Sequence, residues 1–273
     1  IEYNNTELPM TTTTSSYHKH SYRFIYFDVR GAGELCRYML ACSVGVDNNW
    51  EDVRYPMKAA LKGFSYGPEF QRDAASGGFD CNMGNLPVLQ ILQNNDSTRA
   101  IATVGQSHAI ARFVARRHGW MGTSLLDELK IDAVYECCRD IKSAWYRVKQ
   151  KPNGKKQWFV ATDNNNTTAV DDNDDDTLQR YCKKLEKVLL STRLQKTSSF
   201  SSREWCLNTP DPTLADIAIY HLLGTPVSTV SGSTESFFGE TELVIGKAYK
   251  ADCPILTKCV QAVSELPAIK EWE

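Results

Sequence analysis

Hydrophobic positions follow two different periods along the chain, and the change between them divides the chain in two. Arg23–Asp28 (RFIYFD) is β-branched and aromatic and predicts a strand, and Glu51–Tyr55 predicts a second one. Between these strands, apolar residues recur at helical spacing at Leu35, Tyr38, Met39 and Cys42. The order strand, helix, strand predicts a βαβ unit with a parallel pair and a right-handed crossover.

The following segments extend this first part to residue 119. Pro56–Asn85 is polar and rich in glycine, and we expect an irregular, functional connection there rather than packed elements. Pro87–Leu92 (PVLQIL) predicts a strand, Arg99–Val104 its hairpin partner, and Ser107–His118 a helix. The order β-α-β, β-β-α over residues 22–119 predicts a thioredoxin-like domain.

Residues 124–273 have helical periodicity instead. Leu126–Lys149 predicts one long amphipathic helix. Further helices are predicted at Leu178–Leu194, Leu214–Leu223, Thr241–Tyr249 and Pro254–Ser264. Thr213 and Asp216 have the spacing of a capping box at the start of one of them. The expected fold class is therefore α/β plus all-α, with a thioredoxin-like N-terminal domain followed by a helical-bundle C-terminal domain.

Two polar segments lie outside these predicted elements. Residues 1–21 are rich in Thr, Ser and Asn and predict a polar extension, in which either Met10 is the true start or Ile1 marks a processed end. An acidic loop is expected near residues 151–177, and it contains the run Asp171–Asp176. A calcium-binding loop is the alternative, but Thr177 stands where an EF-hand needs glycine, so a solvated acidic loop is favoured.

Charge and cysteine content narrow the possible partners. The chain has 31 basic and 33 acidic side chains, which disfavours nucleic acid as a partner. No apolar run approaches the roughly 20 residues that a membrane-spanning helix needs, so we expect no membrane partner. Nine cysteines are scattered without a zinc-binding spacing. They predict free thiols in a reducing, cytoplasmic setting and no metal site.

Six short motifs occur in an order that resembles one known family. They are YFDVRGAGELCRYMLA, NLPVL, GQSHAIARFVAR, RDIKSAW, PTLADIAIYHLL and ELPAIKEW, and all of them lie between Tyr22 and Trp272. In this order they resemble the cytosolic glutathione transferases, nearest to the sigma class. The resemblance implies glutathione as co-substrate, a small hydrophobic electrophile as second substrate, and a homodimer.

Tyr26 is the candidate catalytic residue, because the resemblance places it where the family activates the glutathione thiol. A thiol has a pKa of about 8.5. Lowering this pKa by two units requires the site to stabilise the thiolate over the thiol by about 2.7 kcal/mol. One hydrogen bond to a charged group supplies roughly 1.5–3 kcal/mol, so a single phenol nearly accounts for the activation. The alternative is that Tyr26 is only an aromatic residue of a strand.

Other residues are assigned to glutathione by the same resemblance. Gln106 and Ser107 would hold the γ-glutamyl end, since the N-terminus of a helix favours an anion, although Ser107 also suits a simple N-cap. Asp140 would reach across the dimer towards the glutathione amine, or would pair with a nearby basic residue. Pro87 resembles the family's cis-proline, which would turn the backbone of Leu86 towards the cysteinyl part. Asn85 flanks this segment.

The sequence departs from the family pattern at one position near Tyr26. Sigma-class proteins usually carry a second arginine two residues after the one that aligns with Arg30, and here that position is Ala32. Arg30 is expected at the glutathione site, where it or water would partly replace the missing side chain. Two alternative functions follow: a non-catalytic structural or scaffold protein with the same fold, and a sigma-like glutathione-dependent isomerase.

Overall fold

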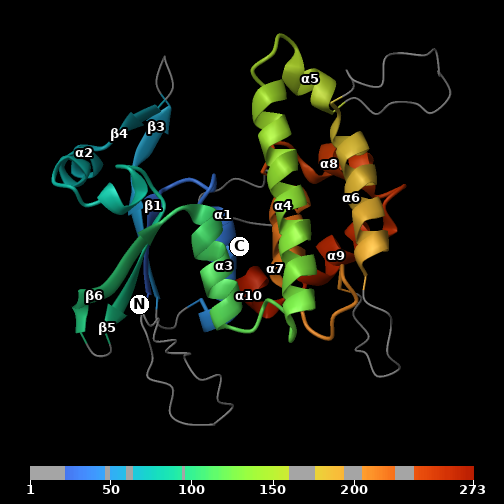
Figure 1. The fold of residues 1–273 in the computed structure, drawn as a ribbon. Coiled ribbons are helices and arrows are strands. Elements are labelled where there is room, and N and C mark those ends of the chain that lie inside the picture. The colour runs from blue at the N-terminus through green and yellow to red at the C-terminus, as the bar shows by residue number, and fades with distance from the viewer. Residues whose placement is uncertain are drawn as a thin grey trace, which may run out of the picture.

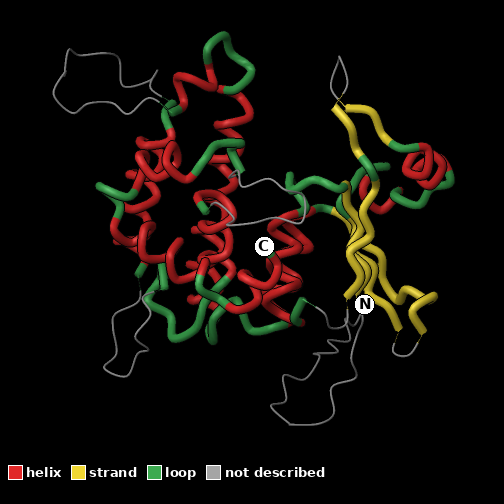
Figure 2. The backbone as a smooth tube through the Cα atoms, turned by 180° about the vertical axis from the view of Figure 1, so that it is seen from behind, coloured by secondary structure: helices red, strands yellow, loops and turns green. Residues whose placement is uncertain are grey.

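Two helices lie between a small sheet and a larger group of helices, and they join the two halves of the chain (Figure 1). The computed structural model describes residues 22–46, 50–59, 64–93, 96–159, 176–193, 205–224 and 237–273. The predicted extension at residues 1–21 and residues 171–175 of the acidic run lie outside this part of the chain. Seen from behind, the strands form one layer and most helices lie to one side of it (Figure 2).

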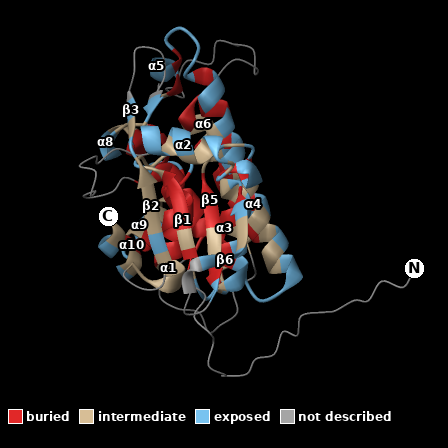
Figure 3. Ribbon diagram, turned by 90° about the vertical axis from the view of Figure 1, so that its left-hand side faces the viewer, coloured by how far each residue is buried: buried red, intermediate tan, exposed pale blue. Residues whose placement is uncertain are grey.

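The sheet confirms the predicted thioredoxin-like arrangement. Its strands are β1 (Tyr22–Phe27), β2 (Trp50–Tyr55), β5 (Val88–Gln93) and β6 (Asp96–Gly105), in the spatial order β2-β1-β5-β6. β1 is parallel to β2 and antiparallel to β5, and β6 is antiparallel to β5. The parallel pair is connected by α1 (Glu34–Val44), as a βαβ unit requires. Burial is concentrated in the central strands β1 and β5 (Figure 3).

Helix α1 is buried along most of its length. Its residues from Glu34 to Ala41 are all buried, because it packs against α3 (Ser107–Arg117) on one side and α7 (Leu214–Leu223) on another. A helix enclosed on several sides needs apolar residues around its circumference, and the sequence LCRYMLA supplies them except at Arg37. The turn that precedes α1 is thereby held at the boundary between the two halves.

The expectation of an irregular connection over Pro56–Asn85 is wrong. The described part of this segment contains β3 (Met57–Ala59), β4 (Phe64–Tyr66), α2 (Pro68–Ala75) and the 3₁₀ turn η1 (Asp80–Asn82). Aromatic packing explains the order: the rings of Phe70 and Phe79 stack at 5.5 Å, and that of Tyr55 lies 5.8 Å from each. Strands of three residues are too short to show an alternating pattern, so periodicity could not predict them.

The second half is helical, as predicted. It contains α4 (Leu125–Val148), α5 (Gly154–Trp158), α6 (Leu178–Thr192), α7, α8 (Glu242–Tyr249), α9 (Pro254–Ser264) and α10 (Pro267–Trp272). Helices α5 and α10 were not predicted, because five or six residues are too few to show a helical period. Helix α5 lies within the segment expected to be an acidic loop. No helix among the described residues is long and apolar enough to cross a membrane.

The capping box predicted at Thr213 and Asp216 is confirmed. The buried carboxylate of Asp216 accepts hydrogen bonds from the backbone N–H and the hydroxyl of Thr213, both at 2.8 Å. A similar box begins α4, where the hydroxyl of Ser124 accepts from the N–H of Asp127 at 3.1 Å. Each box satisfies backbone groups that the first turn of a helix leaves free.

Candidate active site at the domain boundary

Tyr26 lies near the end of β1, directly beneath the turn that leads into α1. A Cβ atom at Gly31 would lie 2.8 Å from its hydroxyl oxygen, and one at Gly33 would lie 2.4 Å from its ring. Only glycine therefore allows the turn to approach the ring this closely. The backbone N–H of Ala32 donates to the Tyr26 hydroxyl at 3.1 Å, which fixes the oxygen and leaves its proton free for another acceptor.

The Tyr26 phenol is protonated at neutral pH. Burial raises its pKa, since the residue is only 8% exposed, and the Ala32 amide opposes this rise in part. Tyr146 on α4 also raises this pKa. A neutral phenol in this position is a hydrogen-bond donor.

A cavity of about 550 Å³ lies between the two halves, next to this turn. Gly31 and Ala32 form part of its wall, and the Tyr26 hydroxyl lies behind this turn, bonded to the Ala32 amide and not among the groups that line the cavity. Ser107, at the start of α3, lines the same cavity. The opposite wall comes from α4 and α7. The structure therefore brings the turn after Tyr26 and the start of the helix at Ser107 to the same cavity.

Asn82, which sequence analysis missed, links the predicted residues just before β5 to the predicted residue just after β6. The Asn82 side chain donates to the carbonyl oxygens of Asn85 and Pro87 at 3.1 and 3.0 Å. Its own oxygen accepts from the Gln106 side chain at 2.8 Å. Gln106 has a φ of 71°, in the left-handed region. Asn82 is only 5% exposed, and it sets the separation between the two predicted glutathione segments.

The segment before β5 has the conformation that the resemblance implied. The Leu86–Pro87 peptide bond is cis. Pro87 is buried, Leu86 is half-buried and Asn85 is exposed. A ligand approaching this edge would therefore meet Asn85 and the backbone of Leu86 first.

Arg30 and Asp140 do not line this cavity. The Arg30 guanidinium donates to the Tyr38 hydroxyl at 2.5 Å and lies 3.9 Å from Glu34, facing a different cavity near the C-terminus. Asp140 is exposed on α4. Within one chain, then, the structure does not bring these two residues to Tyr26 and Ser107.

Several polar residues of the cavity come from the helical half and were not singled out from the sequence. The Lys142 ammonium lies 2.8 Å from Nδ1 of His221, which joins α4 to α7. The ring of His108 lies against Tyr135, with Nδ1 2.6 Å from its hydroxyl. Burial lowers the pKa of His108 to about 4, so this ring is neutral at pH 7. The partners in each pair are far apart in sequence, so no local motif could predict that they meet.

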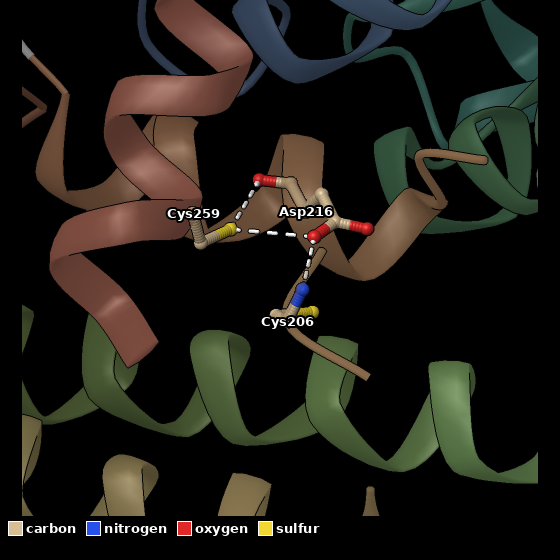
Figure 4. Close-up of side chains that lie close together, drawn as sticks. All are labelled: Cys206, Asp216 and Cys259. Atoms are coloured by element: carbon tan, nitrogen blue, oxygen red, sulfur yellow. Dashed lines mark hydrogen bonds between the residues drawn. The ribbon is translucent and has the colours of Figure 1, made fainter. Parts of the chain in front are cut away.

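A second cluster of potential ligands, Cys206, Asp216 and Cys259, lies within the helical half (Figure 4). The Asp216 carboxylate already accepts from the N–H of Cys206 at 2.8 Å and from the thiol of Cys259 at 3.4 Å, besides its two bonds to Thr213. Burial raises the pKa of Cys259 to about 12. These bonds give the cluster a structural role, in which it fastens α9 and residue 206 to the start of α7.

Comparison with known proteins supports this architecture. No protein-family model matches the chain. S-crystallin 2 of Octopus vulgaris is 24% identical over 225 residues, which cover 80% of this chain and 86% of that protein. Glutathione S-transferase S1 of Drosophila melanogaster is 32% identical over 126 residues, which cover 45% and 40%.

Solved structures share the fold over almost the whole chain. Monomeric Na-GST-3, a glutathione S-transferase of Necator americanus, has a TM-score of 0.57 at 19% identity and covers 92% of this chain and 95% of its own. Prostaglandin synthase D of Nilaparvata lugens has a TM-score of 0.55 at 19% identity and covers 92% and 96%.

Proposed function

We propose that this homologue of the glutathione transferases is itself a glutathione transferase, in which Tyr26 holds the glutathione thiol as a thiolate for attack on a small hydrophobic electrophile. One observation carries the proposal. The Tyr26 oxygen is fixed by the amide of Ala32, in the turn that lines the cavity, and the phenol is protonated, so it can donate to a sulfur atom.

The proposed hydrogen bond is strong enough for this role. A free thiol has a pKa near about 8.5, so only a few per cent is thiolate at neutral pH. A phenol that donates to the thiolate stabilises it by about 1.5–3 kcal/mol, which lowers the thiol pKa by about one to two units. The fixed position of the Tyr26 oxygen adds to the effect, because no reorganisation is required when the anion forms.

The remaining glutathione contacts are proposed from the same geometry. Ser107 and Gln106 would hold the γ-glutamyl carboxylate, since the N-terminus of α3 offers free amides and a favourable dipole. Asn85, with the Leu86–Pro87 backbone, would pair with the cysteinyl part of the peptide. We assign Arg30 to the support of the turn that covers Tyr26, because it is bonded to Tyr38.

We also propose a cytoplasmic homodimer. All nine cysteines are free, which suits a reducing compartment. Exposed apolar side chains gather on β6, α3 and the start of α4, at Ile101, Val104, Phe113, Leu125 and Leu129. Exposed apolar side chains of this kind are typical of an interface between subunits. Asp140, exposed on α4, would then reach the glutathione amine of the second subunit.

The test compares Tyr26→Phe with Tyr22→Phe, which removes a hydroxyl from the same strand. The Tyr22 hydroxyl lies 3.2 Å from Nε2 of His118, whereas that of Tyr26 is bonded to the turn that lines the cavity. With a generic aryl halide, Tyr26→Phe should lower kcat/KM about 10- to 100-fold, and the pKa of bound glutathione should return towards its free value. Glutathione affinity should change little, and Tyr22→Phe should keep parental kcat/KM.

Equal activity in the parent and Tyr26→Phe would contradict the proposed role of the phenol. Binding of glutathione without any turnover in the parent would instead select the second candidate, a non-catalytic protein of this fold. That candidate is favoured by the S-crystallin relative, which matches over 86% of its length, and by Ala32 in place of an arginine. A glutathione-dependent isomerase would use the same thiolate and would be recognised by turnover without consumption of glutathione.

A further inference from the structure

Lys142 is the most unusual charged group of the cavity. It projects from α4, is half-buried, and lies with its ammonium 2.8 Å from Nδ1 of His221 and 5.1 Å from the centre of the Phe237 ring. Burial disfavours its charged form and lowers its pKa to about 8. A buried cation is costly unless an anion pairs with it. The nearest described partner, however, is an uncharged ring.

No carboxylate from the described residues lines this cavity. Its other cation is Arg139, which pairs with Glu136 outside the cavity at 2.8 Å. The two histidines of the wall, His108 and His221, have pKa values lowered mainly by burial, so they are neutral at pH 7. Neutral His221 accepts a hydrogen bond from the Lys142 ammonium and holds it in place without neutralising its charge.

The rest of the cavity suits an apolar molecule. Leu35, Tyr146 and Phe237 contribute apolar surface, and Ala32 adds a small side chain to the same wall. A ligand in this space would have its apolar body between the halves of the chain, with one end near the Tyr26 hydroxyl. Its other end would lie where α4 meets α7, at the unneutralised ammonium.

We propose that the second substrate of this protein is a hydrophobic electrophile that also carries an anionic group, a carboxylate or a sulfonate, and that Lys142 pairs with this group. The inference rests on the proposed function, because it names the class of electrophile for the same cavity. Lys142 thereby selects acidic over neutral molecules. His221 acts as a positioning residue that aims the ammonium.

The binding test uses two fluorescent dyes with the same ring system. Anilinonaphthalene sulfonate carries an anion, and N-phenylnaphthylamine is its uncharged parent. The variants are Lys142→Met, which removes the charge at similar length, and Lys142→Arg, which keeps it. Lys130→Met is the matched control, because Lys130 lies on the same helix and lines neither described cavity.

Lys142→Met should weaken binding of the sulfonate dye about tenfold or more, as expected for loss of a hydrogen bond to a charged group. Binding of the neutral dye should change by no more than about twofold, while Lys142→Arg and Lys130→Met should keep the preference for the sulfonate. If Lys142→Met left the sulfonate affinity unchanged, or weakened both dyes equally, the inference would be overturned.

A second arm separates this inference from the proposed function. Chloronitrobenzoate and the corresponding benzamide are electrophiles that differ in charge, and each kcat/KM is divided by the uncatalysed rate with glutathione. Lys142→Met should lower this ratio for the benzoate about tenfold and leave that for the benzamide unchanged. Selective dye binding without turnover of either compound would refute the transferase while leaving the anion site intact.

Discussion

Two cavities lie beside α1, and they differ in whether the basic side chains that line them are paired with carboxylates. The first, of about 640 Å³, lies between the turn after β1 and the C-terminal residues, and it is lined by Arg30, Arg37 and Arg54. The second is the proposed substrate cavity, where Lys142 has only a neutral histidine beside it among the described residues. The two cavities share the same helix, so the contrast comes from the side chains around each.

In the first cavity every arginine has a carboxylate. Arg37, only 1% exposed, donates to Asp52 at 3.0 Å and to the carbonyl oxygens of Val29 and Phe27 at 2.8 and 3.0 Å. Arg54 lies 2.7 Å from the same Asp52 carboxylate. Charges satisfied in this way hold the end of β1 to α1 and β2. The first cavity is therefore a structural junction.

The C-terminal residues complete this junction. A Glu273 carboxylate oxygen accepts from the hydroxyls of Tyr38 and Tyr220 at 3.0 and 2.7 Å, which links α1 to α7. The indole N–H of Trp272 donates to Glu34 at 3.1 Å. By contrast, no carboxylate among the described residues makes hydrogen bonds of this kind in the proposed substrate cavity. The arginines of the first cavity are all paired with carboxylates, whereas Lys142 has no carboxylate partner among the described residues. We infer from this contrast that Lys142 is available to pair with an external anion.

Replacement of Arg37 should show the largest effect. Arg37→Met leaves the Asp52 and Glu34 carboxylates without their buried partner, and we expect a loss of about 3–5 kcal/mol in the free energy of unfolding. Denaturant titration followed by circular dichroism measures it. Arg23→Met breaks the more exposed pair with Glu51 and should cost no more than about 1 kcal/mol. Equal losses in the two variants would refute the structural assignment of the first cavity.

Removal of the cation from the other cavity should have the opposite sign. Without ligand, Lys142→Met should raise the free energy of unfolding at pH 7 by about 2 kcal/mol, because a buried cation gives way to an apolar side chain. The pKa of Lys142 falls from its ordinary value of 10.5 to about 8 on folding, so folding disfavours the charged form. The penalty is full below about pH 8 and fades as the pH rises towards 10.5.

The gain from Lys142→Met should therefore be largest near neutral pH and should shrink in alkaline buffer. Parallel thermal or denaturant unfolding at several pH values measures this trend, with Lys130→Met as the control. A destabilised Lys142→Met protein at pH 7 would mean that the ammonium is already neutralised, and the contrast between the cavities would disappear.

The smallest expected effect is the pH dependence of anion binding. Affinity for the sulfonate dye should fall about tenfold between pH 7 and 9, because only protonated Lys142 pairs with the anion. The facing groups Cys36 on α1 and Cys138 on α4 have pKa values raised to about 12, and the other basic residue that lines the cavity is Arg139. His108 on α3 and His221 on α7 have lowered pKa values and stay neutral. In Lys142→Met the fall should vanish, and its persistence would assign it to another group.

Much of the fold and part of the site were determined by local signals in the sequence. The strand that carries Tyr26, the helix after it and the capping box at Thr213 and Asp216 each depend on residues close together in the chain. The turn at Gly31 and Gly33 is local as well, because only glycine lets the backbone lie against the Tyr26 ring. Periodicity and spacing record such features directly.

Tertiary structure alone decided the surroundings of these residues. Lys142 and His221 are 79 residues apart, and no motif in the residues around either one predicts their contact. Asn82 likewise bonds both to the segment at Pro87 and to Gln106, which lies 24 residues after Asn82 in the chain. The direction taken by Arg30, away from the substrate cavity, follows from Tyr38 and Glu34 on the facing side of α1. Burial and charge pairing depend on what packs across from a residue, and that is set only when distant segments fold together.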